Sequence, residues 1–356
     1  MEKLRLGLIG LGQVANHYEN VLSKGSLKDH FEISVGVDQM ENARNNWRDR
    51  VKSYVTDDIS NLNPDDIDLA IVLTPSGSHE EDSNKLIEKR INVLCEKPIG
   101  LNISKVEDNI RLAEQNRVQY GGVFQNRFNK PIIFLKKLID NGSFGKIISC
   151  SVRLQWCRLQ EYYNDNWHGK WALDGGVINQ QAIHHIDTLF YLLGPPKKAL
   201  GFSGNLNNSL EAEDTFVASG QLISGGFFTL EATTAIRPHD IKASIEVMGD
   251  KAQASVGGVA LNRVEYLQVD GEESSNRVLE ENSEEAKNGY GNGHTYLLEF
   301  IAEKWKKDQT INLPISASES LRVVKYIHAL YSSVEENKII SFDSEVLSKK
   351  LGVINV

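Results

Sequence analysis

The stretch RLGLIGLGQVA, residues 5–15, decides the fold of this chain. An apolar run typical of a buried strand leads into the spacing G-x-G-x-x-A, and a helical pattern follows. The first glycine permits a tight turn, the second lets a pyrophosphate approach the backbone, and the small third residue lets helix and strand pack closely. The stretch therefore predicts a dinucleotide seat at a helix N-terminus. The residues expected against the dinucleotide are Gly10, Gly12, Gln13, Val14 and Ala15.

The first third of the chain repeats one pattern of strands and helices. Amphipathic segments such as HEEDSNKLIEKR separate short apolar runs, and the short run KSYVTDD is left out of the predicted strands. Strands separated by single helices form βαβ units, which stack into a parallel sheet covered on both faces. The fold class is α/β, beginning with a Rossmann domain over residues 1–123. The predicted strands are 4–10, 31–38, 67–75, 91–98 and 118–125.

The pattern changes after residue 123, and 356 residues are enough for two domains. A helix at 131–142 precedes a strand at 146–156, and after a helix near 180–193 the strands follow one another without helices between them. This order predicts a C-terminal α+β domain over residues 124–356 with a large, mostly antiparallel open sheet. A last helix, capped by Ser316 or Ser318, packs in this domain or, alternatively, back on the first domain together with the tail.

Composition narrows the partners and the compartment. The net charge of −9 disfavours nucleic acid and anionic membranes as partners, because both require a basic surface. Cys95, Cys150 and Cys157 show no CxxC spacing and are predicted to be reduced thiols. The first residues lack a signal-peptide pattern, and no apolar run approaches the roughly 18 residues of a membrane span. We expect a cytoplasmic protein without a membrane segment.

Asp38 ends the second predicted strand, 26 positions after Gly12. An acidic residue near this distance hydrogen-bonds the ribose hydroxyls of NAD. Gln39 and Met40 follow it, and no adjacent arginine is available for a 2′-phosphate. The sequence therefore favours NAD over NADP. The alternative to a dinucleotide site is a glycine-rich turn in an α/β protein that binds a different ligand.

The stretch CEKPIG, residues 95–100, stands at the carboxyl end of a predicted parallel strand. Open α/β sheets bind their ligands at this edge. Because proline follows it, Lys97 lies on a stiff corner and can point its ammonium group into the crevice where a nicotinamide would lie. The alternative is that Lys97 is an ordinary solvent-exposed strand end.

Four stretches, GLIGLGQVA, TPSGSH, CEKPIG and GGVINQQAIHHIDTLFYLLG, together resemble the Gfo/Idh/MocA family of oxidoreductases over nearly the whole chain. The resemblance implies a second domain whose open sheet often builds a homodimer or homotetramer, with substrate held between that sheet and the nicotinamide. It gives Lys97 a catalytic role and a cis peptide bond to Pro98. It places Thr74, Pro75, His79, Glu96, Lys97 and Gln125 at the cofactor.

The resemblance makes His184 the proton-transfer residue. His185 is the alternative, because adjacent residues on a helix diverge by about 100° and cannot both face one site. His184 and Asp187 share a helix face, but no third ligand is apparent, so we expect no metal. Many relatives carry an aspartate four residues before the histidine, where this chain has Gln180. An amide cannot supply the charge that stabilises an imidazolium, so we expect Gln180 to orient substrate or ring by hydrogen bonds.

Residues 152–176, VRLQWCRLQEYYNDNWHGKWALDGG, interleave aromatic and cationic side chains. Aromatic faces with cationic donors suit a sugar that carries a carboxylate or phosphate. A sheet face and an ordered loop packed by aromatic rings is the alternative. The stretch also resembles family members that oxidise nucleotide-linked sugar acids. The residues expected at the substrate are Arg127, Arg153, Arg158, Tyr162, Trp167, Trp171, Asn179, Gln180 and His184.

These features predict an NAD-dependent dehydrogenase that oxidises a secondary hydroxyl of a sugar. A UDP-N-acetylglucosaminuronate-like substrate is the sharper interpretation, with a free aldose or inositol as its alternative. Lys97, with His184, is expected to accept the hydroxyl proton and to stabilise alkoxide charge. A protein that senses NAD(H) or a sugar without turnover is the alternative of another class, favoured by Gln180. A dehydrogenase of an imine or bilin is a third interpretation.

Overall fold

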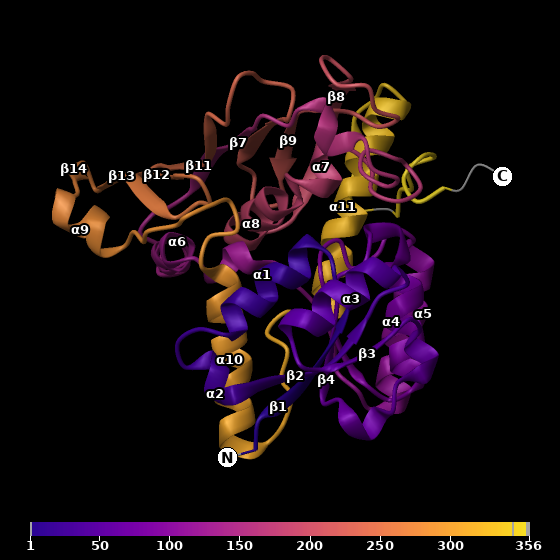
Figure 1. The fold of residues 1–356 in the computed structure, drawn as a ribbon. Helices are drawn as coiled ribbons and strands as arrows, with labels where there is room; N and C mark the ends of the chain where they lie inside the picture. Colours follow the sequence, from indigo (N-terminus) through magenta and orange to yellow (C-terminus); the bar gives the residue numbers. More distant parts are fainter. Residues whose placement is uncertain (1, 344, 354–356) are drawn as a thin grey trace. The chain divides into compact units, whose positions relative to one another are not determined.

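The computed structural model describes residues 2–343 and 345–353, and the chain divides into two compact units. Unit 1 comprises Met1–Val123 and His294–Val324, and unit 2 comprises Phe124–Gly293 and Lys325–Val356. Figure 1 labels the helices and strands. Among the described residues, no helix is both long and apolar enough to cross a bilayer.

Unit 1 is built on a six-stranded parallel sheet with the order β3-β2-β1-β4-β5-β6. Its strands are β1 (Leu4–Ile9), β2 (Phe31–Val37), β3 (Tyr54–Thr56), β4 (Leu69–Val72), β5 (Asn92–Cys95) and β6 (Tyr120–Gly122). Its helices are α1 (Gln13–Leu22), α2 (Leu27–His30), α3 (Glu41–Arg50), α4 (His79–Glu88), α5 (Ile103–Asn116), most of α10 (Gly293–Asp308) and the first part of α11 (Ala317–Glu335). This strand order is that of a Rossmann fold, so the predicted Rossmann fold is confirmed.

The strands of this sheet are apolar almost throughout, as expected where both faces are covered. All four residues of β4 and five of the six in β1 are buried. The run KSYVTDD, which was not predicted as a strand, contributes β3 as an edge strand parallel to β2. Three residues carry too short a pattern to distinguish a strand from a loop.

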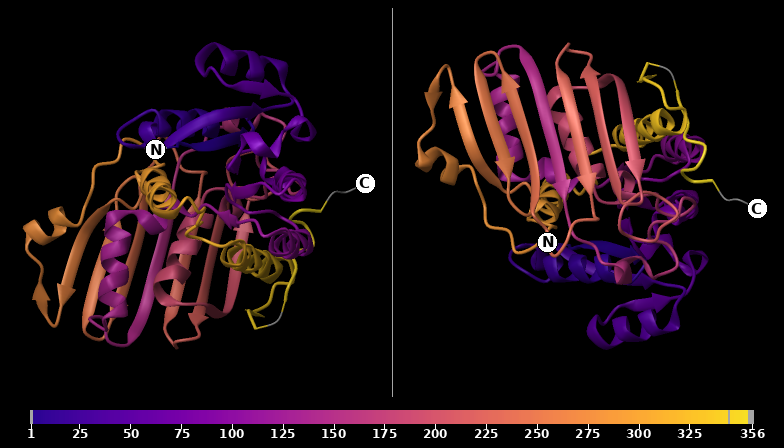
Figure 2. Two further views of the ribbon diagram at one scale, coloured as in Figure 1. Left: turned by 90° about the horizontal axis from the view of Figure 1, so that it is seen from below. Right: turned by 90° about the horizontal axis from the view of Figure 1, so that it is seen from above.

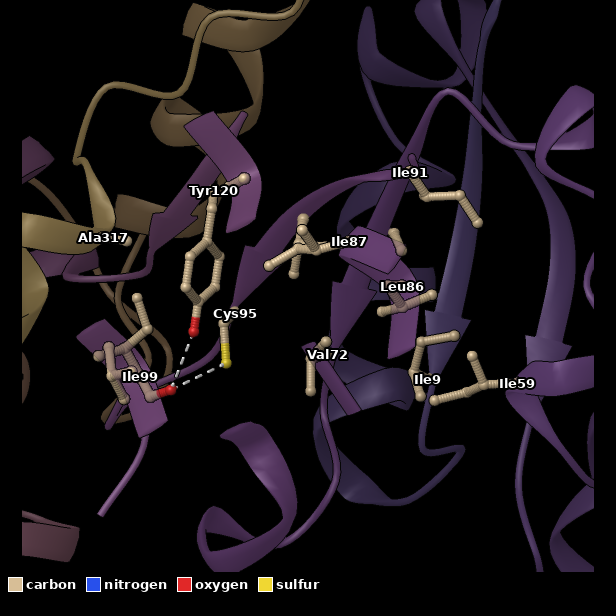
Figure 3. Packing of buried hydrophobic residues seen from close by; sticks show 14 of the residues in the cluster. Ile9, Ile59, Val72, Leu86, Ile87, Ile91, Cys95, Ile99, Tyr120 and Ala317 are labelled. Atoms are coloured by element: carbon tan, nitrogen blue, oxygen red, sulfur yellow. Dashed lines mark hydrogen bonds between the residues drawn. The ribbon is translucent and has the colours of Figure 1, made fainter. Parts of the chain in front are cut away.

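The core of unit 1 fixes the chain on both sides of the E-K-P corner. Aliphatic side chains from β1, β4, β5 and α4 pack in one buried cluster (Figure 3). At its edge, the Cys95 thiol and the Tyr120 hydroxyl both point to the carbonyl oxygen of Ile99, at 3.9 and 3.4 Å. Residues 95 and 99 are therefore held directly before and after residues 96–98.

Residues 294–324 belong to unit 1 and residues 325–356 to unit 2, whereas the predicted second domain covered residues 124–356, with packing of the last helix and tail on the first domain as its alternative. Ala317, Leu321 and Val324 of α11 are buried in the same cluster as the strands of unit 1. The amide of Gly122 also donates to the carbonyl of Ile315 at 3.2 Å. Local pattern predicted the helix, but the sheet it packs on is set by contacts between residues far apart in the sequence.

Unit 2 is built on a nine-stranded sheet with the order β14-β13-β12-β11-β7-β10-β9-β8-β15. Its strands are β7 (Ile147–Gln155), β8 (Pro196–Gly204), β9 (Thr215–Leu222), β10 (Phe227–Thr233), β11 (Lys242–Gly249), β12 (Ala252–Gly257), β13 (Arg263–Val269), β14 (Glu272–Glu273) and β15 (Ile340–Ser341). Its helices are α6 (Lys130–Asp140), α7 (Val177–Gln180), α8 (Ile183–Leu193), α9 (Asn276–Glu281) and the end of α11. Strands β7 and β10 pair in parallel and the other pairs are antiparallel, so the predicted mostly antiparallel sheet is confirmed.

The two faces of this sheet differ. In β7 the side chains of Cys150, Val152 and Leu154 are buried, while Arg153 between them is partly exposed. Helix α8 packs against β7, and Figure 2 shows α6 along one face of the sheet. The opposite face is the open one. In the right-hand view of Figure 2, no described helix crosses in front of its strands.

Helix α11 begins with a capping box at Ser316. The amide of Glu319 donates to Ser316 Oγ at 3.2 Å, and Glu319 Oε2 accepts from the Ser316 amide at 3.1 Å. We expect Ser316→Ala to lower the free energy of unfolding by about 1 kcal/mol, as measured by urea denaturation. Ser318→Ala is the control, because Ser318 is exposed and lies inside the helix. Equal losses from the two changes would contradict the assignment of the cap.

Candidate active site

The glycine-rich turn joins β1 to α1 and leaves its second glycine open. Gly10 has a φ of +93°, and a Cβ there would lie 2.9 Å from backbone atoms of Leu73 and Thr74, so only glycine fits. At Gly12 a Cβ would meet no described atom within 4 Å, whereas Ala15 is fully buried. Gly12 is also the N-cap of α1, whose positive dipole end favours a phosphate. The turn fits the expected dinucleotide.

Asp38 holds this turn against the end of β2. Its Oδ2 accepts from the amide of Leu11 and its Oδ1 from the amide of Met40, each at 2.8 Å. Arg44 of α3 donates to the carbonyl oxygens of Asp38 and Gln39, also at 2.8 Å. An arginine therefore does lie at this turn, six positions beyond Asp38, and its guanidinium is bound to the backbone there.

His79 ties two loops of unit 1 together. Its Nε2 lies 2.7 Å from the carbonyl oxygen of Thr74, and its Nδ1 lies 2.6 Å from that of Pro98. Pro75 starts the short turn between Thr74 and His79, and the Thr74 hydroxyl donates to Asp82 at 2.7 Å. Because His79 is only 1% exposed, it connects the loop after β4 to the E-K-P corner after β5.

Lys97 follows β5, and the peptide bond between Lys97 and Pro98 is cis, as the resemblance implied. The side chain of Glu96 turns into unit 1 and is 7% exposed. Its Oε1 accepts from the Tyr18 hydroxyl at 2.9 Å and lies 3.1 Å from His294 Nε2, and its Oε2 accepts from the Lys97 amide at 3.2 Å. The sequence patterns did not reveal Tyr18 and His294, which lie 78 and 198 positions from Glu96.

In unit 2 the two adjacent histidines of α8 have different surroundings. His184 is partly exposed, and its Nε2 lies 3.5 Å from the amide nitrogen of Gln125, which was expected at the cofactor. His185 is 3% exposed, its ring packs edge-on against Trp156, and burial lowers its pKa to about 4. His185 therefore remains neutral near neutral pH, and His184 is the histidine with access to solvent.

Arg127, expected at the substrate, forms a two-pronged ion pair with Asp187. The distances are 2.9 Å from Nε to Oδ2 and 2.6 Å from Nη2 to Oδ1, and the guanidinium lies over the ring of Tyr191. The pair holds residues 125–128 against α8, beside the contact between Gln125 and His184. Within residues 2–343 and 345–353, no group of three His, Cys, Asp or Glu side chains is arranged to hold a metal ion.

Gln180 and His184 do not share one continuous helix. Helix α7 ends at Gln180, and Gln181 and Ala182 separate it from α8. Gln180 and Asn179 are both buried. The side-chain amide of Asn179 donates to a backbone carbonyl of the preceding loop, that of Asp174, at 2.5 Å, so Asn179 holds the approach to α7.

Glu213 is a buried carboxylate at the start of α7 that the sequence patterns did not single out. Its Oε1 accepts from the Tyr331 hydroxyl at 2.9 Å and from the amide of Ile178 at 3.2 Å. A side chain at Gly176 would collide with this carboxylate, which explains the glycine. Burial raises the pKa of Glu213 to about 8. The group fixes the beginning of the short helix that ends at Gln180.

An aromatic and cationic group lies beyond the end of β7. The Arg158 guanidinium stacks on Trp156 and Tyr162, 4.8 and 5.9 Å from the ring centroids, and Nη1 lies 3.2 Å from Asp240. The ring of His168 packs against the rings of both Tyr162 and Trp167, with centroid distances of 4.3 and 3.6 Å respectively. The structure therefore brings Arg158, Tyr162 and Trp167 into one contiguous group.

Arg153 and Trp171 do not join this group. Arg153 lies on the open face of β7, opposite the buried face, and pairs with Glu246 at 3.2 Å. Trp171 packs against Tyr331 and Lys350. Side chains alternate between the faces of a strand, and β7 ends at Gln155. The sequence alone did not show that Arg153 lies on the open face of β7 while Arg158 lies beyond the end of the strand.

A Rossmann unit with a glycine-rich turn and an E-K-P corner, followed by an α+β unit with a partly exposed histidine, defines a class of NAD-binding oxidoreductase. The chain belongs to the Gfo/Idh/MocA oxidoreductase family. Residues 4–123 match the family's NAD-binding Rossmann fold, and residues 136–342 match its C-terminal alpha/beta domain. The predicted family, fold class and NAD cofactor are confirmed.

Two solved structures are similar along nearly the whole chain. The WlbA dehydrogenase from Bordetella pertussis, in complex with NADH and UDP-GlcNAcA, is 26% identical with a TM-score of 0.88, covering 96% of this chain and 98% of that one. The WlbA dehydrogenase from Chromobacterium violaceum, with the same ligands, is 25% identical with a TM-score of 0.86, covering 96% of each chain.

Relatives known by sequence carry different activities. The 2,7-anhydro-N-acetylneuraminate hydratase of Mediterraneibacter gnavus is 27% identical over a match that covers 62% of this chain and 59% of that protein's length. Glucose-6-phosphate 3-dehydrogenase of Bacillus subtilis is 25% identical over 70% of this chain and 73% of that protein. Family membership therefore leaves the substrate to be argued from the site.

The buried carboxyl group of Glu213 predicts a pH-dependent stability. Its folded pKa of about 8 lies above the ordinary value, so folding disfavours the charged form of the group. The free energy of unfolding is therefore highest in acid, where Glu213 is protonated in both states, and falls as pH rises toward and through 8. We expect Glu213→Gln to be more stable than the wild type at pH 8.5, by on the order of 3 kcal/mol, and nearly equal to it at pH 5.

Urea denaturation across this pH range measures the difference. Glu211→Gln is the control, because Glu211 is exposed and its substitution removes the same formal charge. A constant difference between Glu213→Gln and wild type at all pH values would show that the carboxyl group does not titrate as its burial requires.

Proposed function

We propose that this chain is an NAD-dependent dehydrogenase that oxidises a secondary hydroxyl of a nucleotide-linked sugar acid, of the UDP-N-acetylglucosaminuronate type. The observation that carries the proposal is the likeness, over nearly the full length, to two dehydrogenases crystallised with NADH and UDP-GlcNAcA. The stacked arginine of unit 2 supports it, because a neutral sugar does not require a cation.

Residues of unit 1 would hold the cofactor. The open backbone at Gly12 and the N-terminus of α1 suit the pyrophosphate, and Asp38 suits the adenosine ribose. Thr74, Pro75 and His79 shape the loop after β4. When bound, NAD accepts a hydride from the substrate carbon. Glu96 is assigned to positioning Lys97, since its carboxylate is enclosed within unit 1.

Lys97 and His184 would handle the substrate proton. As the hydride leaves the carbon, the hydroxyl must lose its proton, and a lysine or histidine at hydrogen-bond reach can accept it. The cationic form of Lys97 would stabilise charge that develops on the oxygen. Gln125, beside His184, would orient the imidazole through its amide.

Arg158 would recognise the anionic part of the substrate. Its guanidinium is stacked on two rings, which restricts it to one orientation, and Asp240 holds one edge. Tyr162 and Trp167 would supply aromatic faces to the sugar or base. Arg153, on the other face of the sheet, is left out of this set.

Other activities remain as defined alternatives. A free aldose or inositol is the alternative substrate, and the relative from Bacillus subtilis, named for glucose 6-phosphate, keeps a sugar phosphate among them. A hydratase or a non-catalytic sensor would give no net NADH. We also propose a cytoplasmic location and assembly into a homodimer or homotetramer through the open sheet face of unit 2.

The proposed function predicts turnover of a UDP-linked sugar acid. We expect NADH to form, measured at 340 nm, with UDP-GlcNAcA and NAD⁺, and Lys97→Ala to lower kcat by about 10²–10⁴-fold. The dissociation constant for NADH, measured by fluorescence, should change less than about twofold in Lys97→Ala. Lys105→Ala is the control, since Lys105 is an exposed lysine of the same unit. Unaltered kcat in Lys97→Ala would contradict its assignment, and product without NADH would identify a hydratase.

The substrate charge can be tested separately at Arg158. Arg158→Ala should raise KM for UDP-GlcNAcA by about 10–100-fold, the effect of a lost charge-assisted hydrogen bond. KM for any neutral sugar that is turned over should change little. Arg263→Ala, an exposed arginine on β13, controls for the change in net charge. Equal effects on acidic and neutral substrates would mean that Arg158 stabilises the fold around it and does not bind the anionic group of the substrate.

A further inference from the structure

The strongest unassigned feature of unit 1 is the buried polar network around Glu96. The carboxylate has three donors: the hydroxyl of Tyr18, the Nε2 of His294 and the backbone amide of Lys97, at 2.9, 3.1 and 3.2 Å. They come from α1, from α10 and from the E-K-P corner itself. A carboxylate surrounded in this way has little freedom to rotate toward a cofactor.

The partners of Glu96 are themselves buried and suited to donate. Tyr18 is 0% exposed and His294 is 2% exposed. Burial raises the pKa of the Tyr18 phenol well above its ordinary value, so the hydroxyl keeps its proton. The ring of His17 lies 4.8 Å from that of His294, and burial followed by the nearby His294 lowers the pKa of His17 to about 4. Near neutral pH, Tyr18 and His294 therefore contact the carboxylate directly, and a neutral His17 packs against His294.

Such a network is costly unless every donor is in place. A buried carboxylate that loses a hydrogen-bond partner must rotate, recruit water or take up a proton. Because Glu96 Oε2 accepts from the Lys97 amide, a rotation of the carboxylate changes the hydrogen bond that holds the Lys97 backbone. On the other side, His79 binds the carbonyl of Pro98. The backbone of Lys97 is thus held by one buried contact before it and another after it.

We propose that Glu96, held by Tyr18 and His294, is a positioning residue that sets the aim of Lys97. This inference rests on the proposed function only in giving Lys97 a role in proton transfer. We expect the network to act mainly on the chemical step, because Glu96 contacts the Lys97 amide, while Tyr18 lies on α1 six positions after Gly12. A displacement of a reacting group by about 1 Å can lower turnover by about 100-fold.

The sharpest variant is Tyr18→Phe, which removes one hydroxyl from the network and leaves the ring. We expect kcat with UDP-GlcNAcA to fall by about 5–50-fold, with KM values for NAD⁺ and the sugar within about twofold of wild type. Tyr266→Phe is the matched control. Tyr266 is a half-buried tyrosine of unit 2 whose hydroxyl donates to Gln268 at 2.9 Å, so this change removes one hydroxyl hydrogen bond outside the E-K-P corner.

A double-variant cycle separates positioning from general destabilisation. If Tyr18 acts through Lys97, adding Tyr18→Phe to Lys97→Ala should not lower the residual turnover further. Glu96→Gln, which keeps the shape of the side chain, should behave in the same way and serves if Tyr18→Phe does not fold. Independent losses in the double variants would overturn the proposal.

A second measurement needs no turnover. The rate at which acetic anhydride acetylates Lys97, followed by peptide mass spectrometry without substrate, reports the exposure and basicity of its amine. We expect this rate to change at least threefold in Tyr18→Phe and Glu96→Gln and to be unchanged in Tyr266→Phe. Equal rates in all four proteins would overturn the network proposal.

The two proposals fail in different ways. If Lys97→Ala keeps its kcat while acetylation still depends on Tyr18, the proposed role of Lys97 in proton transfer is wrong but the network does position Lys97. If Lys97→Ala loses kcat while Tyr18→Phe and Glu96→Gln match Tyr266→Phe in both measurements, the function stands and the network proposal is wrong.

Discussion

The parallel sheet of unit 1 is the constraint on which the rest depends, because parallel strands bring their carboxyl ends to one edge. The turn after β1, Asp38 after β2, the TPSGSH loop after β4 and Lys97 after β5 all lie at such ends. Short hydrogen bonds then join them: Asp38 binds the amide of Leu11, and His79 joins the carbonyls of Thr74 and Pro98. The parallel sheet thereby gathers segments from Leu11 to Pro98 at one edge, where we propose that the cofactor binds.

Each unit also contains a buried acidic side chain that holds the backbone near its candidate proton-transfer residue. In unit 1, Glu96 supports the amide of Lys97, and in unit 2, Glu213 supports the start of α7, the helix that precedes His184. A tyrosine hydroxyl donates to each carboxylate, from Tyr18 and Tyr331 respectively. Hydrogen bonds to a buried acidic group have specific geometry, so each group favours one arrangement of the segments around it.

Sequence could predict what local patterns determine. The glycine spacing, the alternation of strands and helices, and the place of Lys97 at a strand end all follow from runs of about ten residues. Side-chain partners from distant segments could not be predicted: His294 is 198 positions from Glu96, and Glu213 reaches Tyr331 across 118. Arg153 shows a second limit, because one residue of register in β7 decides which face of the sheet a side chain occupies.

The division into two units suggests how one fold serves several substrates. The contacts described above for Asp38, His79 and Glu96 join residues of unit 1, while the stacking of Arg158 and the ion pair of Arg127 with Asp187 join residues of unit 2. Substitutions in residues 156–171 can therefore alter the chemistry presented to a substrate without breaking a hydrogen bond of the cofactor seat. The relatives fit this reasoning, since they are named for a hydratase, a sugar-phosphate dehydrogenase and inositol dehydrogenases within one family. Under the proposed function, specificity would depend on a stacked arginine and its rings, and binding of the hydride-accepting cofactor on an edge of the parallel sheet.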